Sequence, residues 1–317
     1  MPNLDPLLTI FTAPKPFTDP HISLIQSNAI RSWLHLGDEV SVLIIGDEPG
    51  LAEFAHQAGV LQLPGVARNG QGTPLVSSIF ALARQASSSP LMAYVNADIL
   101  LTSQLVNTAS QVFCELKKFL IIGQRHDLSV KQPVEFTTSW EASLMAEVQE
   151  HGRLHPSAGS DFFIFPRTCF TDIPHFAIGR AGWDNWMIYD ARMQHLPTID
   201  ATSAITAIHQ DHDYSHLPNG VAHYHLPESF ENLRLAGGPR TVFTLKDADY
   251  RFENGVVLPI ARSPAKIMRE IEIFPLVRLR TRTLADIFFT IFHPIKGVKE
   301  LRGRLAYKLS RTRGAHA

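Results

Sequence analysis

Short apolar runs alternate with helical patterns along the first hundred residues of the chain. Residues 7–11, 40–45 and 91–95 form continuous apolar runs, which are typical of strands covered on both faces of a sheet. Residues 21–36 instead repeat apolar side chains at a helical period, at Ile22, Ile25, Ala29, Ile30, Trp33 and Leu34. This alternation predicts βαβ units that feed a parallel sheet.

Weaker signals continue the pattern. Residues 51–58 predict a helix closed by Gly59, residues 60–63 a short strand, and Thr73-Pro74 the start of a helix that runs to about residue 86. Further on, we expect strands at 119–123 and 162–165, a loop at 125–133, a loop leading into a helix over 179–193, and irregular structure over 197–227. The predicted fold class is α/β, with a mainly parallel twisted sheet flanked by helices and a helical basic C-terminal tail.

Composition supports a globular chain and excludes several classes of function. With 317 residues and 45% hydrophobic content, the chain can bury a large core. The net charge of −1 argues against a nucleic-acid partner, because that affinity depends on surplus Lys and Arg. Cys114 and Cys169 lie in apolar stretches and are expected to be reduced, packed thiols. Without a secretory pattern or an apolar run of spanning length, a cytoplasmic location is expected.

Candidate chemistry gathers where predicted strands end. In open α/β sheets the ligand crevice lies beyond the carboxyl ends of the strands. The polar and loop residues that follow the runs are Thr12, Ala13, Lys15, Asp47, Arg68, Asn96 and Asp98. An acid such as Asp98 directly after a buried strand suits a divalent cation, Mg²⁺ or Mn²⁺, that bridges two phosphates. The alternative is a helix N-cap or a plain turn.

The order of these motifs resembles the A-type (GT-A) fold of nucleotide-sugar glycosyltransferases. The resemblance covers roughly residues 7 to 225 and includes Gly46-Asp47 after the second strand and an acidic motif after the fourth. Asn96-Ala97-Asp98 is similar to the DxD motif of that family, with Asn in place of the first Asp and therefore one anionic ligand fewer. The resemblance implies a nucleoside-diphosphate-sugar donor, with Asp47 at the base or ribose and the loop from Thr12 to Lys15 beneath it.

A second motif is Gly182-Trp183-Asp184-Asn185-Trp186. Indole rings stack on pyranoses, and a carboxylate beside them can accept the proton of an attacking hydroxyl. The segment is similar to the Gly-Trp-acid motifs of inverting galactosyltransferases, which implies that Asp184 is the general base and that Trp183, with Asn185, binds the acceptor. Asp161 can line the same cleft or simply terminate a loop. The alternative for the whole motif is a capping Asp between two core tryptophans.

Five histidines follow, at His209, His212, His216, His223 and His225. Their loose spacing favours surface or core roles for most of them. His209 is the exception: it follows the β-like stretch from Ala204 to Ile208, and the resemblance implies that a C-terminal His completes the coordination of the cation with Asp98. An imidazole beside a carboxylate and two phosphate oxygens suits Mn²⁺.

The C-terminal part has its own charge. Residues 262–317 contain 13 Lys and Arg against 4 Asp and Glu, interleaved with apolar residues. Such a stretch can lie at an anionic membrane surface and bring the enzyme to a lipid-linked acceptor, or it can pack as a helical pair on the catalytic domain. The expected domains are 1–261, with a nucleotide-binding half (1–100) and an acceptor half (101–261), and a basic extension at 262–317.

The predicted function is transfer of a sugar from a nucleoside-diphosphate sugar to a hydroxyl of a glycan or lipid-linked acceptor, assisted by a cation. The G-x-S-x-G, Walker, G-x-G-x-x-G and H-E-x-x-H motifs of other enzyme classes are missing. One alternative is a nucleotidyltransferase of sugar phosphates, although Ala13-Pro14-Lys15-Pro16 lacks the glycine of such loops. Another is a non-catalytic nucleotide-sugar-binding domain. Arg68 and Arg125 can counter pyrophosphate charge, or they can be solvated surface residues.

Overall fold

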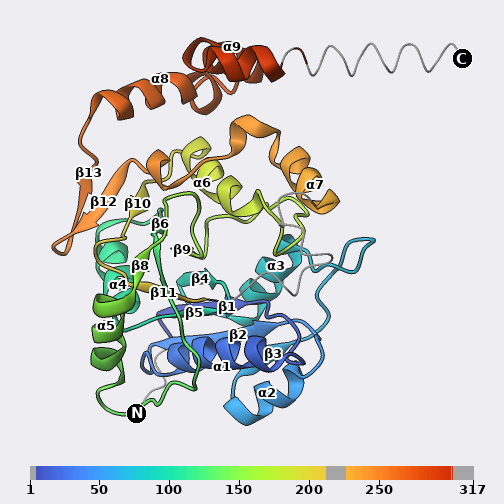
Figure 1. The fold of residues 1–317 in the computed structure, drawn as a ribbon, viewed down its shortest axis with the longest axis vertical. Helices are drawn as coiled ribbons and strands as arrows, with labels where there is room; N and C mark the ends of the chain where they lie inside the picture. Colours follow the sequence, from blue (N-terminus) through green and yellow to red (C-terminus); the bar gives the residue numbers. More distant parts are fainter. Residues whose placement is uncertain (1–4, 212–225, 301, 303–317) are drawn as a thin grey trace, which may run out of the picture. The chain divides into compact units, whose positions relative to one another are not determined.

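The computed structural model describes residues 5–211, 226–300 and 302 (Figure 1). The chain divides into two compact units, residues 1–260 and residues 261–317.

The first unit is built on a nine-stranded sheet of the described residues. In spatial order its strands are β13 (Val256–Pro259), β12 (Tyr250–Glu253), β10 (Thr198–Asp200), β6 (Leu120–Ile122), β9 (Phe162–Pro166), β4 (Leu91–Val95), β1 (Leu8–Thr12), β2 (Val40–Ile45) and β3 (Leu61–Leu63). Five neighbouring pairs are parallel: β1 with β2 and β4, β2 with β3, and β10 with β6 and β12. Strand β9 is antiparallel to both of its neighbours, and β13 is antiparallel to β12. The predicted α/β class with a mainly parallel sheet is confirmed.

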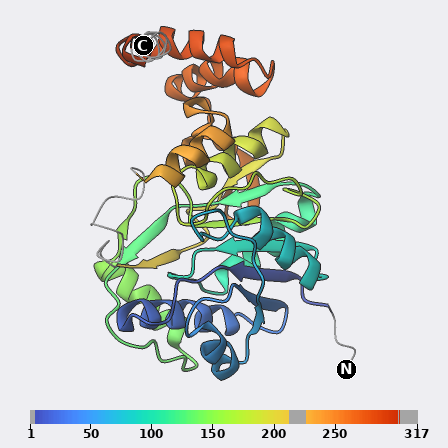
Figure 2. The ribbon, with the colours of Figure 1, turned by 90° about the vertical axis from the view of Figure 1, so that its right-hand side faces the viewer.

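Helices cover both faces of this sheet (Figures 1 and 2). Successive strand residues point to opposite faces. Ile10 and Ala93 therefore face a core cluster that includes residues of α1 (Pro20–Leu34), α2 (Leu51–Ala58) and α4 (Gln104–Glu115). Phe11 and Tyr94 face the other way, toward Phe80 of α3 (Val76–Ala86) and Trp183 of α6 (Trp183–Met193). The Phe11 and Phe80 rings, for example, meet edge to face at 4.9 Å.

Local signals explain the ends of these helices. Asp19 caps α1 by accepting hydrogen bonds from the backbone N–H groups of His21 and Ile22, each at 2.9 Å, and Pro20 takes the first helical position. Helix α3 begins two residues later than Pro74 suggests, because Pro74 and Leu75 form isolated β-bridges with Arg68 and Ala177.

A second, smaller sheet has the order β5 (Ile99–Leu100), β11 (Ala207–Gln210), β7 (Arg125–Leu128) and β8 (Arg153–Leu154). Helix α5 (Trp140–His151) covers it with Trp140, Leu144 and Val148. The expected loop at 125–133 is wrong over β7, and the expected irregular region at 197–227 is wrong over β10, while β11 overlaps the β-like stretch expected at 204–208. These strands are short and β7 is mostly polar, so pairing across the fold rather than an apolar run creates them.

The remaining described elements of the first unit lie after residue 226. Helix α7 (Pro227–Ala236) is followed by two 3₁₀ turns, Pro239–Thr241 and Leu245–Asp247. The β12–β13 hairpin turns at Asn254-Gly255, both at positive φ, as the tight hairpin turn requires. Cys114 is exposed, against the expectation of a packed thiol, because it lies outside the buried stripe of α4, whereas Cys169 is buried as expected.

The second unit contains α8 (Pro264–Val277) and α9 (Arg282–Phe292). Ser263 caps α8 through a hydrogen bond from the backbone N–H of Lys266. Both helices leave large apolar side chains exposed, at Ile267, Met268, Ile271, Phe274, Leu284, Ile287 and Ile291. Within the part of the chain that the structure describes, no helix combines the length and apolar character needed to cross a membrane.

Candidate functional site

The carboxyl ends of β1, β2 and β4 lie along one edge of the main sheet, because these strands are parallel and in register. Thr12 ends β1, and Ala13 and Lys15 follow it. Asp47 follows β2, and Asn96 and Asp98 follow β4. The residues predicted to bind the donor after these three strands therefore share one edge.

Tyr94, near the end of β4, marks the centre of the site. Its ring meets the Trp183 indole edge to face at 4.9 Å. Burial raises the pKa of the Tyr94 phenol well above its usual range, and the negative charges of Asp98, Asp161 and Asp184 raise it further. The charges of three acids from distant parts of the sequence therefore act on one phenol, whose ring lies against Trp183.

The backbone at Asp98 is held by Gln210 of β11. The Gln210 backbone N–H and its side-chain amide donate to the Asp98 carbonyl oxygen at 3.3 and 3.1 Å. The same amide also donates to the Ile25 carbonyl of α1 at 2.7 Å, and Asn28 of α1 donates to Gln210 Oε1 at 3.1 Å. Because Gln210 is fully buried, this clamp fixes the turn after β4 against α1. Sequence analysis missed Gln210, since a glutamine next to a histidine has no distinctive pattern.

His209 lies beside Asp98, as the sequence predicts for a shared cation site. Its Nε2 atom is 3.8 Å from Asp98 Oδ2, and the side chain is almost buried. The histidine lies within β11, opposite Ile99 of β5, rather than after the strand as expected. An imidazole nitrogen and a carboxylate oxygen at this separation form a donor set that fits Mn²⁺ or Mg²⁺ once phosphate oxygens add to it.

Two acids that the sequence did not suggest lie on the other side of the His209 ring. Asp127 Oδ1 and Asp211 Oδ1 are 3.3 and 3.9 Å from His209 Nδ1. One ligand atom from each of Asp127, His209 and Asp211 can be chosen so that all lie within 4.8 Å of one another. The parallel pairing of β11 with β7 brings these residues together. Neither strand carries a sequence pattern that predicts this pairing.

The hydrogen bonds that Asn96 makes with Asp161 explain why an amide stands at position 96. Its side-chain amide donates to Asp161 Oδ1 at 2.7 Å, and its backbone N–H donates to the Asp161 carbonyl. Arg125 extends this hydrogen-bond network: its Nη1 atom lies 3.0 Å from Asp161 Oδ2, and its Nε atom lies 3.0 Å from Asp127 Oδ1. A carboxylate at position 96 would repel Asp161, whereas the amide satisfies it. Arg125, with 17% of its side chain exposed, is an ion-paired residue of this network rather than a solvated one.

Asp184 lies in the first turn of α6, after Gly182 at the N-cap. Burial raises the pKa of its carboxyl to about 6, backbone N–H groups including that of Gly182 oppose the shift, and the charge of Asp161 adds to it. Gly159 passes so close that a Cβ atom there would lie 2.8 Å from Asp184 Oδ2. A carboxyl that titrates near neutral pH has the property that a general base requires.

The neighbours of Asp184 are packed side chains. Trp183 is only 5% exposed and meets Tyr94 and Phe163, while Trp186 contacts Phe176. The Asn185 amide donates to the carbonyls of Ala158 and Phe243 at 2.9 and 2.6 Å. Trp183 is therefore packed against other aromatic rings and Asn185 is hydrogen-bonded to backbone carbonyls. Their acceptor-binding roles stay predictions.

Lys15 and its loop are fastened to α1. Gln26 accepts from the Lys15 backbone N–H at 2.6 Å and donates to the Lys15 carbonyl at 3.0 Å. Loss of water around the amine lowers the pKa of Lys15, and attraction to Asp98 opposes that shift. This interaction places a cation on the Asp98 side of the loop.

Asp47 lies at the surface with 59% of its side chain exposed, and it pairs with Arg68. Arg68 also contacts Glu48 Oε1 at 2.8 Å and donates to the Gly72 carbonyl at 3.0 Å. The two residues predicted at the donor therefore meet each other at the edge beyond β2. Glu48 joins them, although its position next to Asp47 did not single it out as a candidate.

The loop that contains Arg68 is tied to α7. Glu228, which is nearly buried, accepts from Asn69 Nδ2 at 2.6 Å and pairs with Arg180 Nε at 2.6 Å. Because Arg180 precedes the Gly182-Trp183-Asp184 motif, Glu228 connects the Arg68 loop with the loop that leads to Asp184. Sequence analysis left this link unnoticed, since Glu228 follows Pro227 as an ordinary first-turn acid.

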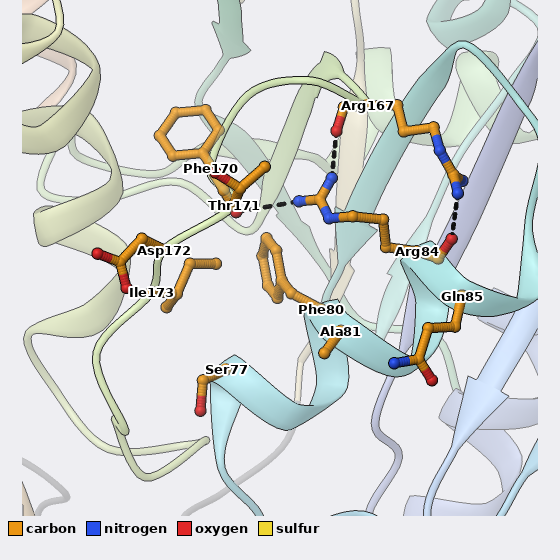
Figure 3. Close-up of a pocket in the computed structure, with 10 residues that line it drawn as sticks. All are labelled: Ser77, Phe80, Ala81, Arg84, Gln85, Arg167, Phe170, Thr171, Asp172 and Ile173. Carbon is orange, nitrogen blue, oxygen red and sulfur yellow. Dashed lines mark hydrogen bonds between the residues drawn. The ribbon is translucent and has the colours of Figure 1, made fainter.

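A cavity of about 410 Å³ lies between α3 and the segment after β9 (Figure 3). Its Arg84 and Arg167 side chains donate to backbone carbonyls, Arg84 to those of Arg167, Cys169 and Phe170, and Arg167 to those of Ser87 and Arg84. Pro166, at the end of β9, pairs with Leu91 at the start of β4, so the Arg84 and Arg167 end of this cavity lies toward the edge of the sheet opposite Asp98. The two arginines fasten the end of α3, while Phe80, which also lines the cavity, stacks on Tyr94.

Of the five clustered histidines, His209 alone falls within the described residues. His212, His216, His223 and His225 lie outside them, as do residues 303–317 of the basic extension.

Comparison with known proteins finds likeness only among solved structures. No family model matches the chain, and no curated protein matches it. Glucosyl-3-phosphoglycerate synthase from Mycobacterium tuberculosis, in complex with Mn²⁺, uridine diphosphate and phosphoglyceric acid, matches with a TM-score of 0.45 and 15% identity, over 74% of this chain and 80% of that chain. A second structure of that enzyme matches with a TM-score of 0.44 and 16% identity, over 84% and 92%.

Proposed function

We propose that this chain is a glycosyltransferase that moves a sugar from a nucleoside-diphosphate sugar to a hydroxyl acceptor. One observation supports the proposal: Asp98, with His209 at 3.8 Å, and Asp184, next to Trp183, both act electrostatically on Tyr94, near the carboxyl end of β4. Had the fold separated Asp98 from Asp184, a shared site for a diphosphate and an acceptor would have been impossible.

The donor side is assigned to the edge beyond β1, β2 and β4. Asp98 and His209 would hold a Mn²⁺ or Mg²⁺ ion, which supplies positive charge to the departing diphosphate. Lys15 adds a cation near Asp98, and Thr12 and Ala13 provide the floor of the nucleotide site. Asp47, with Arg68, lies where the base or ribose is expected. Asn96 orients Asp161 within the same wall.

The acceptor side is assigned to Asp184 and its neighbours. Asp184 takes the proton of the attacking hydroxyl, for which a pKa of about 6 is well placed, since the group is ionised at neutral pH and still basic. This role applies to a reaction that inverts the anomeric centre. Trp183, Asn185 and Asp161 shape the acceptor pocket around it.

We further propose the wider setting of this activity. Residues 1–100 form the nucleotide-binding half and residues 101–261 the acceptor half of a cytoplasmic catalytic domain. The acceptor is a glycan or a lipid-linked sugar, and residues 262–317 contact the inner face of the membrane. Support for that contact comes from the exposed apolar side chains of α8 and α9, together with the cationic excess of this stretch.

Two alternatives give different results in one measurement. A nucleotidyltransferase of sugar phosphates would bind a nucleoside triphosphate with a sugar phosphate, and a non-catalytic domain would bind a nucleotide sugar without turnover. Calorimetric titration of the full chain with nucleoside diphosphates and triphosphates, in the presence of Mn²⁺, identifies the base and the phosphate number. A complete lack of heat with every nucleotide would remove the proposal.

Turnover of the donor that binds is then measured in two variants. Asp98→Asn and Asp184→Asn are expected to keep the fold and to lower turnover at least about 100-fold, the usual scale of a lost general base. Asp172→Asn, at the cavity beside α3, is the matched control and should keep wild-type turnover. Full activity in both site variants would show that these roles are misassigned.

A further inference from the structure

His209 presents its two ring nitrogens to two different carboxylates. Strand β11 lies between β5 and β7, and His209 is paired with Ile99 on one side and with Asp127 on the other. Nε2 points toward Asp98 at 3.8 Å, while Nδ1 lies 3.3 Å from Asp127 Oδ1. A neutral imidazole carries one proton, so the nitrogen that keeps it decides which nitrogen can coordinate a cation.

Asp127 is held more firmly than any other group that faces Nδ1. Its Oδ2 atom accepts from His155 Nδ1 at 2.8 Å, and its Oδ1 atom accepts from Arg125 Nε at 3.0 Å. The other neighbour of Nδ1, Asp211, lies 3.9 Å away, is 38% exposed, and meets Arg153 at 3.4 Å. Only 16% of the Asp127 side chain is exposed.

The charges around Asp127 favour a role in orienting His209 over a role as a direct ligand of the cation. Arg125 bridges Asp127 and Asp161, so the negative charge of Asp127 is already matched by a guanidinium. A carboxylate occupied in this way can still accept one hydrogen bond from an imidazole N–H. Asp98, on the opposite side of the ring, lies at the strand edge where the diphosphate is placed.

We propose that Asp127 is a positioning residue that accepts the Nδ1–H of His209 and thereby turns an unprotonated Nε2 toward the cation site at Asp98. Carboxylates that orient metal-binding histidines in this way raise the basicity of the ligand and fix its ring. The inference rests on the proposed function, since it takes Asp98 and His209 as the ligands. The competing arrangement is a three-ligand cation site on the Nδ1 side of the His209 ring, made by Asp127, His209 and Asp211.

The first test measures Mn²⁺ affinity of the full chain without nucleotide, by the electron paramagnetic resonance signal of the free ion. Asp127→Asn is expected to weaken affinity about 10- to 100-fold, the usual cost of losing such a partner. Asp211→Asn is the matched control, because it removes a carboxylate charge from the same side of the ring, and it should change affinity less than about threefold. Equal losses in both variants, with Asp98→Asn unaffected, would establish the three-ligand site instead.

The second test reads the tautomer directly and needs no cation. Nitrogen-15 NMR of histidine-labelled wild-type protein at pH 8, with His209 assigned by comparison with His209→Gln, should show a proton on Nδ1 and none on Nε2. In Asp127→Asn the population should move toward the Nε2–H form, a change that loss of packing alone does not produce. A wild-type His209 protonated on Nε2 overturns the inference even if the chain proves to be a glycosyltransferase.

Discussion

Asp184 offers a prediction in which activity and stability move in opposite directions. The pKa of its carboxyl rises from 3.8 to about 6 on folding, mainly through burial. Each pKa unit corresponds to about 1.4 kcal/mol, so keeping Asp184 ionised at pH 7 destabilises the fold by about 3 kcal/mol at most. Because the side chain is only partly buried, solvent screening reduces this to about 2 kcal/mol. Asp184→Asn should therefore stabilise the protein at neutral pH while abolishing the general base.

The pH dependence gives the sign of the effect. Between pH 4 and 6 the folded protein binds more protons at Asp184 than the unfolded chain does, so the wild-type free energy of unfolding falls as pH rises through this interval. The variant lacks this titration. The difference between the two should be near zero below pH 4 and reach about 2 kcal/mol above pH 6, which corresponds to about 4–8 °C in Tm for a unit of this size.

Asp190 provides a matched control on the same helix. Burial raises the pKa of its carboxyl to about 6 as well, a hydrogen bond from Gln194 opposes the shift, and Asp172 adds to it. Asp190→Asn should stabilise the fold with the same pH profile and keep wild-type kcat. Urea unfolding followed by circular dichroism from pH 4 to 8, with turnover measured in parallel, checks both variants. An Asp184→Asn protein that is less stable than wild type at pH 8 would refute the reasoning.

Three further predictions concern other parts of the molecule. Asn96→Asp should lower the free energy of unfolding by about 1–3 kcal/mol at pH 7, because it replaces the 2.7 Å hydrogen bond to Asp161 by two facing carboxylates, and urea titration measures the loss. Gly159→Ala should displace the Asp184 carboxylate and lower kcat about 10-fold or more while Tm stays nearly unchanged; unchanged kinetics would mean that Asp184 tolerates the shift. Arg278→Gln with Arg280→Gln should weaken sedimentation with phosphatidylglycerol vesicles about 30-fold, at about 1 kcal/mol per cation, and leave binding to neutral vesicles unaffected.

The core of the fold could be predicted from the sequence because the residue patterns that determine its strands are local. The apolar runs that became β1, β2 and β4 are long enough to bury on both faces, and these strands end at Thr12, Ile45 and Val95. Asp98 was identified for the same reason, since the end of a buried strand in a βαβ unit faces the crevice of the sheet. The motif around Asp184 was also found locally, by two tryptophans beside an acid.

The small sheet escaped prediction because its causes are remote in the sequence. Strand β7 reads Arg-His-Asp-Leu, which has no apolar run, and β5 is only two residues long. These segments become strands only when β11 lies between them. The roles of Asp127, Arg125 and Gln210 depend on that arrangement, so inspection of each segment alone found little.

Apolar periodicity and strand ends are properties of neighbouring residues, so they were enough to predict the parallel half of the main sheet, its covering helices, and three of the acids assigned to the site. Tertiary structure alone decided which nitrogen of His209 faces Asp98, why Asn rather than Asp suits position 96, and how Arg125 joins Asp161 to Asp127. Apart from the pair Arg125–Asp127, these are contacts between residues 36 to 111 positions apart, and a chain specifies them only through the packing free energy of the whole unit.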